Sequence, residues 1–309
     1  MPKRRKKQRP PANPYAPKYW STWMLVGVAW VITRLPLAWI RNLGHASGDL
    51  LYRFGTSRRN ITLRNLELCF PELDATERSA LARRVFRSVG IGGLELMIPW
   101  LHPQRDLRPH FTLRGVEHLE AAVAEGRGVI LIGAHWAVMD VISQPLGDLG
   151  SVDVMYRYNK NPVWEWLQVS GRQRYFTNVI ERSDTRGVLK ALKSGRAIWY
   201  APDQDYGPKH SVFAPFFGID TATITATSRF ARLNNSPVVF LRQHRDEHRM
   251  HWHLEFSAPL DNFPSDDEQA DAARMNAILE AEIRKAPHQY LWLHKRFKTR
   301  PTGTASLYD

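Results

Sequence analysis

The sequence predicts an α/β fold, with a largely parallel mixed sheet flanked by helices and an N-terminal membrane helix. From Phe111 onward, strand-length runs rich in β-branched residues alternate with helix-length segments, which is typical of parallel sheets. Residues 20–40 are instead almost continuously apolar. We expect three parts: a basic disordered tail at 1–18, a membrane anchor helix with its continuation at 19–55, and a catalytic domain at 56–309.

The expected elements follow from hydrophobic periodicity and from turn residues. Two helical regions come first, at Arg58–Cys69 and Asp74–Leu101, and in the second Asp74 and Glu77 have the spacing of a capping box. The expected strands are Phe111–Arg114, Gly128–Ile132, Val152–Tyr156, Ala197–Tyr200, Val238–Leu241 and His251–Phe256. The expected helices between and after them are Val116–Glu125, Ala137–Leu149, Asn161–Tyr175, Arg186–Ser194, Thr223–Asn234 and Asp266–Lys285.

The positive charge of the chain is concentrated at its N-terminus. The net charge is +13, and residues 1–64 contain 13 of the 43 Lys and Arg residues against a single acid, Asp49. The charges of residues 65–309 nearly balance. A basic segment of this kind suits two partners, a nucleic acid or an anionic membrane surface.

The apolar run beside the basic tail favours the membrane. Trp20, Trp23, Trp30 and Trp39 mark it, and aromatic residues of this kind are enriched at membrane interfaces. The run barely reaches the ~20 residues needed to span a bilayer, and Arg34 and Pro36 interrupt it. A tilted span and a helix embedded in one leaflet are both open, and a buried core helix is the third interpretation. A secretory signal peptide fits poorly, because no small-residue cleavage site follows.

The composition bounds the chemistry further. Cys69 is the single cysteine, so an internal disulfide is impossible and a reducing compartment fits. The 12 histidines are scattered, and neither CxxC nor HExxH occurs, so the spacing suggests no bound metal.

The most informative segment is the strand Gly128–Ile132 with the histidine that follows it. His135 lies just beyond the expected carboxyl end of this strand, where reacting groups collect in open α/β sheets. Asp140 follows five residues later. The two side chains can meet if His135 lies in the turn before a helix and Asp140 in its first turns, because positions five apart on one helix diverge. The alternative is a buried histidine with an aspartate that starts a helix.

A second polar cluster follows the strand Ala197–Tyr200. Asp203 and Asp205 lie there in a segment rich in Pro and Gly, which could also be a plain turn. Arg172 and Arg174 lie on an expected helix and could instead form its solvated face.

Several reaction classes lack support. The chain contains no G-x-S-x-G, no P-loop and no strand-linked G-x-G-x-x-G, which argues against a serine-hydrolase elbow and against the common nucleotide sites. A histidine base without a protein nucleophile predicts that a substrate hydroxyl attacks. With a membrane anchor, we expect that substrate to be a lipid.

Several motifs of the chain resemble those of a known family. The H-x4-D spacing of His135 and Asp140 is similar to the H-x4-D/E signature of glycerolipid-type, or lysophospholipid-type, acyltransferases. Further blocks resemble the lipid A late acyltransferases, the lauroyl/myristoyl transferases of lipopolysaccharide biosynthesis. These blocks are Tyr19-Trp-Ser-Thr-Trp23, Arg64-Asn-Leu-Glu-Leu-Cys-Phe-Pro-Glu72, Trp199-Tyr-Ala-Pro-Asp-Gln-Asp-Tyr-Gly-Pro208, Phe213-Ala-Pro-Phe-Phe217 and Gln289-Tyr-Leu-Trp-Leu-His-Lys-Arg-Phe-Lys-Thr-Arg-Pro301.

The resemblance implies a reaction and its partners. The enzyme would move a lauroyl or myristoyl chain from acyl-carrier protein to the free 3-hydroxyl of a hydroxyacyl chain on a Kdo-lipid A precursor. It would act at the cytoplasmic face of the bacterial inner membrane, in contact with membrane lipid and without nucleic acid. No metal or organic cofactor is implied. The acyl length would follow from the depth of an apolar tunnel, because each buried methylene is worth about 0.8 kcal/mol.

The resemblance also assigns residues. His135 would be the general base and Asp140 its orienting partner, and Arg172 and Asp203 match further positions tied to activity. We expect Arg172 to stabilise the thioester oxyanion or to bind a phosphate, and Asp203 to hold Arg172 or His135. Arg174 and Asp205 are expected to bind substrate.

Two other functions are consistent with parts of the sequence. The same chemistry could serve an acyltransferase for another glycolipid or a lysophospholipid. The basic tail could instead belong to a membrane-tethered nucleic-acid-binding protein, but the balanced charge of residues 65–309 argues against it.

Overall fold

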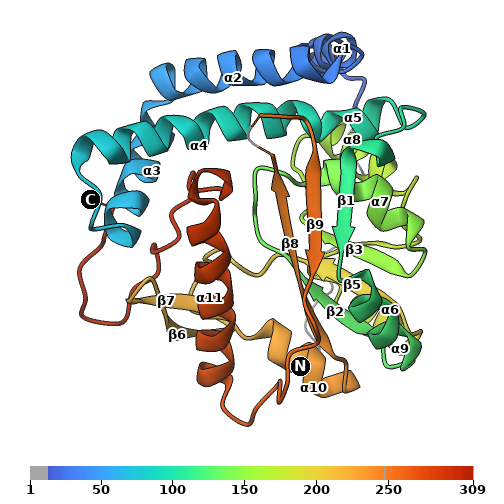
Figure 1. Cartoon of the computed structure of the whole chain (residues 1–309), viewed down its shortest axis with the longest axis vertical. Coiled ribbons are helices and arrows are strands. Elements are labelled where there is room, and N and C mark those ends of the chain that lie inside the picture. Colours follow the sequence, from blue (N-terminus) through green and yellow to red (C-terminus); the bar gives the residue numbers. More distant parts are fainter. Residues whose placement is uncertain (1–12, 247, 309) are drawn as a thin grey trace.

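A computed structural model describes residues 13–246 and 248–308. Within them, seven strands form the main sheet in the order β1-β9-β8-β2-β5-β3-β4 (Figure 1). Their bounds are β1 Phe111–Arg114, β2 Val129–Ile132, β3 Val152–Tyr156, β4 Val179–Glu181, β5 Ala197–Tyr200, β8 Val238–Arg245 and β9 Trp252–Phe256. A separate hairpin pairs β6 Ser211–Phe216 with β7 Ile219–Ile224.

The sheet is mixed but largely parallel, as predicted. Strands β8, β2, β5, β3 and β4 run in one direction. Strand β9 pairs antiparallel with β8, and β1 pairs parallel with β9. The fold class is therefore confirmed. The sequence did not predict β4, which has three residues, or the hairpin β6–β7, whose second strand was assigned in part to a helix.

Helices cover the sheet and extend beyond it. Their bounds are α1 Trp20–Ile32, α2 Leu37–Phe54, α3 Thr56–Cys69, α4 Ala75–Glu95, α5 Met97–Leu101, α6 Val116–Ala124, α7 Ser143–Asp148, α8 Pro162–Arg172, α9 Thr185–Lys193, α10 Ala226–Asn234 and α11 Glu268–Lys285. Short 3₁₀ turns lie at η1 Pro17–Tyr19, η2 Arg108–His110, η3 Asp140–Ile142 and η4 Pro287–Gln289. The capping box of Asp74 and Glu77 is formed.

One predicted helix is much shorter than expected. The segment 137–149 begins as an extended loop, and helical structure starts only with η3 at Asp140. The backbone N–H of Ala137 donates to the carbonyl of Gln289, 2.7 Å away. This long-range bond and the β-bridge of Trp136 with Tyr290 hold the start of the segment against the C-terminal part of the chain.

The expectation of an N-terminal membrane helix is not supported. The apolar run is divided into α1, with 13 residues, and α2, and the division lies between Thr33 and Pro36. Across residues 13–246 and 248–308, no helix combines the length and the hydrophobicity that crossing a bilayer requires. Pro36 lacks a backbone N–H and fixes its φ angle, so it ends one helix and starts the next. Residues 1–12 of the predicted basic tail lie outside the described residues.

Helix α2 instead packs lengthwise against α4, and the two run side by side (Figure 1). Glycines bring the two backbones together: a Cβ on Gly90 would lie 2.2 Å from the carbonyl oxygen of Gly44 and 2.6 Å from the backbone nitrogen of Gly48. The opposite face of α2 is left uncovered.

Candidate active site

The C-terminal segment fixes the backbone of His135. Strand β2 ends at Ile132, and His135 follows in an irregular stretch at the carboxyl edge of the parallel strands. The backbone N–H of Leu291 donates to the carbonyl of His135 at 2.9 Å. Trp136 and Tyr290 form a β-bridge beside it. The histidine is therefore held between the sheet and a segment more than 150 residues away in sequence.

Asp203, rather than Asp140, is the carboxylate partner of His135. The Nδ1 atom of His135 lies 2.6 Å from Oδ1 of Asp203, and the backbone N–H of His135 donates to Oδ2 at 3.1 Å. The Asp203 side chain is 1% exposed and that of His135 is 19% exposed. The sequence left two roles open for Asp203, and the geometry selects the contact with His135.

The electrostatics of this pair favour an ionised Asp203. Burial raises the pKa of Asp203, but the charge and the hydrogen bonds of His135 outweigh burial, so the pKa lies well below its usual value. An ionised carboxylate only accepts hydrogen bonds, so Nδ1 of His135 must carry a proton. In the neutral ring the lone pair is then on Nε2, which makes Nε2 the basic atom.

The predicted pairing of His135 with Asp140 is wrong. Asp140 starts η3, as the sequence required, but its carboxylate binds Arg172 in a bidentate ion pair, with Nε–Oδ1 at 2.5 Å and Nη2–Oδ2 at 2.8 Å. Both side chains are largely buried, at 10% and 12% exposed. The guanidinium offers two parallel donors that match a carboxylate better than one imidazole nitrogen does.

Arg172 connects the site to the N-terminal helices. It lies at the end of α8, and its guanidinium lies 5.7 Å from the ring centroid of Trp100. Burial lowers the pKa of Arg172, but the charge and hydrogen bonds of Asp140 more than reverse this and raise the pKa. Trp100 belongs to an apolar cluster that includes Val26 of α1 and Leu167 of α8.

The two residues expected to bind substrate contact other parts of the chain. Arg174 donates from Nη1 to the carbonyl of Trp100 at 2.6 Å. Asp205 accepts from the backbone N–H and the hydroxyl of Thr299, at 2.6 and 2.8 Å, and its side chain is 2% exposed. These contacts hold α5 and the C-terminal segment, and substrate binding by either residue stays a prediction.

The sequence analysis missed two residues beside the His135–Asp203 pair. The rings of His294 and His135 lie 6.4 Å apart between centroids, and both ring nitrogens of His294 are buried without a hydrogen-bond partner among the described residues. Burial lowers the pKa of His294 to about 4. Burial and the charge of Asp203 raise the pKa of Tyr290 well above its usual value. The signal was available, because both residues lie in the block 289–301.

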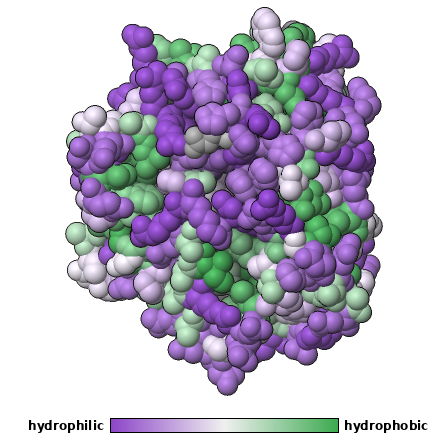
Figure 2. All heavy atoms as spheres, viewed as in Figure 1, coloured by the Kyte–Doolittle hydropathy of each residue, from purple (hydrophilic) through white to green (hydrophobic). Residues whose placement is uncertain are grey.

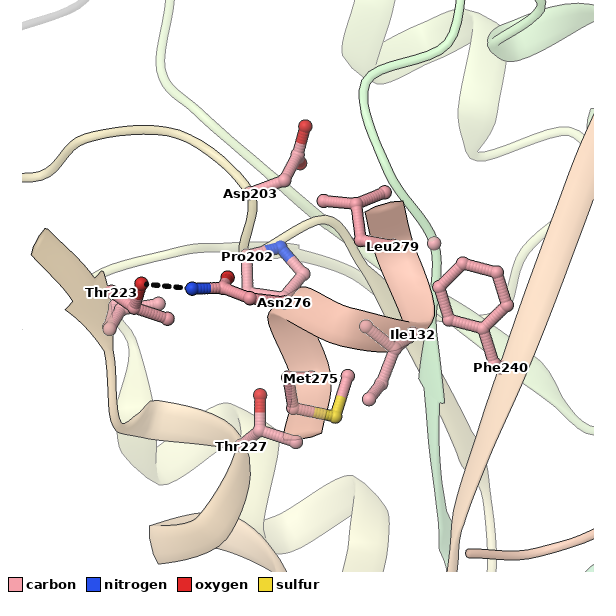
Figure 3. Close-up of a pocket in the computed structure, with 11 residues that line it drawn as sticks. Ile132, Pro202, Asp203, Thr223, Thr227, Phe240, Met275, Asn276 and Leu279 are labelled. Carbon is pink, nitrogen blue, oxygen red and sulfur yellow. Dashed lines mark hydrogen bonds between the residues drawn. The ribbon is translucent and has the colours of Figure 1, made fainter. Parts of the chain in front are cut away.

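A narrow pocket lies directly behind Asp203 (Figure 3). Ile132, Phe240 and Leu279 line it, and the carboxylate of Asp203 points away from them (Figure 3). A hydrogen bond of 3.0 Å from Asn276 to the Thr223 hydroxyl closes one side. The Asp203 carboxylate instead contacts His135.

This arrangement can take a proton from a hydroxyl and stabilise the imidazolium that results, because an ionised and buried carboxylate lies on Nδ1. Arg172, held by Asp140, carries a guanidinium of the kind that stabilises a developing oxyanion. The site therefore suits acyl transfer to an alcohol.

Comparisons with known proteins agree with this chemistry. Residues 12–299 match the family model described as bacterial lipid A biosynthesis acyltransferase. The chain is 40% identical to the lipid A biosynthesis lauroyltransferase of Escherichia coli (strain K12) over 94% of this chain and 96% of that one. It is 39% identical to the palmitoleoyltransferase of the same strain, over 94% and 95% of the two chains.

A more distant relative, the lipid A biosynthesis myristoyltransferase of Escherichia coli (strain K12), is 27% identical over 94% of this chain and 91% of that one. The matches run through the N-terminal helices, the sheet and the C-terminal segment that holds His135. The chain thus belongs to the family of bacterial lipid A biosynthesis acyltransferases.

Proposed function

We propose that this enzyme transfers a fatty acyl chain from an acyl-carrier-protein thioester to the 3-hydroxyl of a hydroxyacyl chain on a Kdo-lipid A precursor. The observation that carries the proposal is the contact of His135 Nδ1 with the buried carboxylate of Asp203. It leaves Nε2 as the basic atom of a side chain that is 19% exposed. Family membership supports the lipid A acceptor.

The proton and electron movements then balance. Nε2 of His135 takes the proton of the acceptor hydroxyl while the oxygen attacks the thioester carbonyl carbon. The tetrahedral intermediate carries its negative charge on the former carbonyl oxygen. When it collapses, the C–S bond breaks, and the leaving thiolate takes the proton back from the imidazolium. Asp203 stabilises the imidazolium between these two steps.

Arg172 is our candidate for stabilising the oxyanion. A guanidinium has five N–H donors, and Asp140 occupies only Nε and Nη2. Asp140 fixes the orientation of the Arg172 guanidinium, which also lies beside the Trp100 ring. In this assignment Asp140 acts on catalysis through Arg172 and is a positioning residue.

The enzyme would reach its lipid substrate from the membrane surface of the inner leaflet. Helix α1 exposes Trp20, Met24, Leu25 and Val28, each more than half exposed, and α2 exposes Trp39, Leu50 and Phe54 similarly. Hydrophobic residues in green are visible among hydrophilic ones along the upper edge of Figure 2, where Figure 1 places α1 and α2. This pattern favours the one-leaflet arrangement among those that the sequence left open.

The test is turnover of the purified enzyme with a panel of acyl-carrier-protein donors and tetra- and penta-acylated acceptors. We expect His135→Ala to abolish transfer while the variant folds and sediments with membranes. Retained turnover in that variant would refute the assignment of His135 as the general base. The same panel determines acyl preference, which the nearly equal identities to a lauroyl- and a palmitoleoyltransferase do not.

The second candidate is an acyltransferase that acts on another glycolipid or a lysophospholipid, since the His135 chemistry is indifferent to the rest of the alcohol. Mass spectrometry of lipid A from a deletion strain separates the two. One fewer acyl chain supports the lipid A acceptor, and an unchanged acyl count favours the alternative.

A further inference from the structure

Two arginines without a carboxylate partner lie side by side at the edge of the sheet that carries His135. Strands β3 and β4 are parallel with Tyr156 opposite Glu181. Arg157 and Arg182 are the residues that follow, and the backbone N–H of Arg182 still donates to the carbonyl of Tyr156 at 2.8 Å. Neighbouring strands are only ~5 Å apart, so the two residues leave the sheet next to each other.

The nearby carboxylates are engaged elsewhere. Glu181 accepts hydrogen bonds from the backbone and the hydroxyl of Ser183. Glu165 accepts from the Tyr156 hydroxyl and from the backbone N–H of Asn159, at 2.9 and 2.8 Å. Among the described residues, no ion pair within 4.0 Å reaches the guanidinium of Arg157 or Arg182. Like charges in adjacent positions of neighbouring strands repel each other, and an anion bound between them would relieve this repulsion.

Tyr206 places the two arginines beside the reaction centre. The Arg182 guanidinium lies 5.4 Å from the centroid of the Tyr206 ring. Burial raises the pKa of Tyr206, the charge of Asp203 raises it further, and the charges of Arg182 and Arg157 oppose both. Tyr206 follows Asp203 by three residues and contacts Arg182, so it connects the arginines to the segment that holds His135. It donates a long hydrogen bond of 3.5 Å to the carbonyl of Ala201.

Arg172, the arginine that the sequence offered for a phosphate, is paired with Asp140. Arg157 and Arg182 add two guanidinium groups at the carboxyl edge of the same sheet. Both Arg157 and Arg182 are solvent-exposed, so a ligand can reach them without rearrangement of the fold.

We propose that Arg157 and Arg182, with Tyr206 beside them, form a phosphate-binding subsite at the entrance to the His135 site. Two guanidinium forks suit the oxygens of a phosphate. The inference rests on the proposed function, in which two substrates could supply that group: the phosphopantetheine arm of the donor and a sugar phosphate of the acceptor. The shared chemistry is a phosphate ester bound while its substrate reacts at His135.

The test compares the double variant Arg157→Gln/Arg182→Gln with the wild type on matched substrates. For the donor, acyl-phosphopantetheine is compared with acyl-pantetheine, which lacks the phosphate. For the acceptor, the phosphorylated precursor is compared with its dephosphorylated form. We expect the double variant to raise KM about 10- to 100-fold for one phosphate-bearing substrate and to leave KM for its phosphate-free counterpart unchanged. The substrate affected identifies the source of the phosphate.

The control is Arg114→Gln. Arg114 is an exposed arginine at the end of β1. Strand β1 runs against β3 and β4, so Arg114 leaves the opposite edge of the sheet. We expect Arg114→Gln to leave kcat and KM unchanged for every substrate. Arg182→Lys keeps the positive charge but loses the paired N–H donors of the guanidinium. If the site binds phosphate, its KM should lie between those of the wild type and the double variant.

The outcomes separate the subsite from the proposed function. Equal KM changes for the phosphate-bearing and phosphate-free forms of both substrates overturn the subsite, while wild-type turnover would still support acyl transfer. Binding of acyl-phosphopantetheine and of the acceptor to the His135→Ala enzyme by calorimetry provides a readout without turnover. The subsite is also overturned if Arg157→Gln/Arg182→Gln leaves the binding of both ligands unchanged.

Discussion

At the scale of single residues, the central finding is that Asp203 takes the role expected of Asp140, and that Asp140 pairs with Arg172 instead. Asp203 lies on His135, and Asp140 lies on Arg172. Each pair joins a residue of the segment 135–140 to one from a different element: Asp203 follows β5, and Arg172 ends α8. The order of the residues in the chain could not reveal this, because both acids lie within reach of the same edge of the sheet.

Replacing each acid by its amide should distinguish these roles. Asp203→Asn removes the acceptor that fixes the His135 tautomer, so we expect kcat to fall by about 10²- to 10⁴-fold. Nitrogen NMR of the imidazole should show Nε2–H gaining population. Asp140→Asn should lower kcat through a loosened Arg172 while leaving the His135 tautomer unchanged. A tautomer shift in Asp140→Asn, with none in Asp203→Asn, would contradict the assignment.

His294 should make the fold sensitive to acid. Its pKa is about 4 in the folded protein and about 6.5 when unfolded. Above pH 6.5 both states are neutral and this group has no effect. As the pH falls from about 6.5 to about 4, only the unfolded state gains the proton, so stability falls. The loss from this residue should reach about 2 kcal/mol at pH 5.

Urea unfolding at pH 7.5 and pH 5.0 measures this effect. The difference in the free energy of unfolding between the two pH values should be smaller in His294→Gln than in the wild type. An equal difference in the two proteins would show that His294 takes up a proton in the folded state.

At the scale of elements, the glycine contact between α2 and α4 determines where the apolar N-terminal segment lies. Gly44 and Gly48 of α2 and Gly90 of α4 let the two backbones touch. This close approach holds α2 against the domain and turns its other face, with Trp39 and Leu50, outward.

A methyl group at this contact should separate the helices. Gly90→Ala places its Cβ 2.2 Å from the carbonyl oxygen of Gly44, and we expect it to lower the free energy of unfolding by about 1–3 kcal/mol. Gly93→Ala on the same helix is the matched control, because a Cβ there has no neighbour within 4 Å. It should raise stability by about 0.5–1 kcal/mol. Denaturant unfolding of both variants measures the two values, and a stabilising Gly90→Ala would refute the close contact.

At the scale of the whole molecule, the apolar faces of α1 and α2 and the arginines around the site suggest how the enzyme meets two different substrates. An open groove of about 500 Å³, lined by Tyr15, Trp20, Trp23 and Met24, adds to the apolar surface at the start of α1. Helix α1 packs on α5, whose Trp100 lies beside Arg172. In the proposed function, α1 would meet the membrane, and its packing on α5 would link that surface to the tryptophan beside Arg172.

Vesicle binding tests this surface. Met24→Ser and Trp39→Ser each remove a side chain that is more than 60% exposed, and together they should weaken partitioning into anionic vesicles at least about tenfold. Leu233→Ser on α10 removes an equally exposed leucine, 66% exposed, away from α1 and α2 and should leave binding unchanged. Equal loss in both variants would argue against a specific surface.

The sequence by itself determined the strands of the main sheet except β4, most of the helices, and the candidates His135, Asp140, Arg172 and Asp203. Short buried runs such as Val129–Ile132 carry their own hydrophobic signal, and the turn residues between elements mark their ends. It also placed His135 at a carboxyl edge, because that follows from the strand alone. The family blocks added Arg172 and Asp203.

Only the tertiary structure decided which of these residues meet. The pairing of His135 with Asp203, the contact of His135 with Leu291 and the proximity of His294 all join segments more than 60 residues apart. The close packing of α2 against the domain also depends on a later helix, through Gly90 of α4. Hydrophobic pattern is a local property of the chain, whereas these contacts depend on how distant elements pack, which no local pattern records.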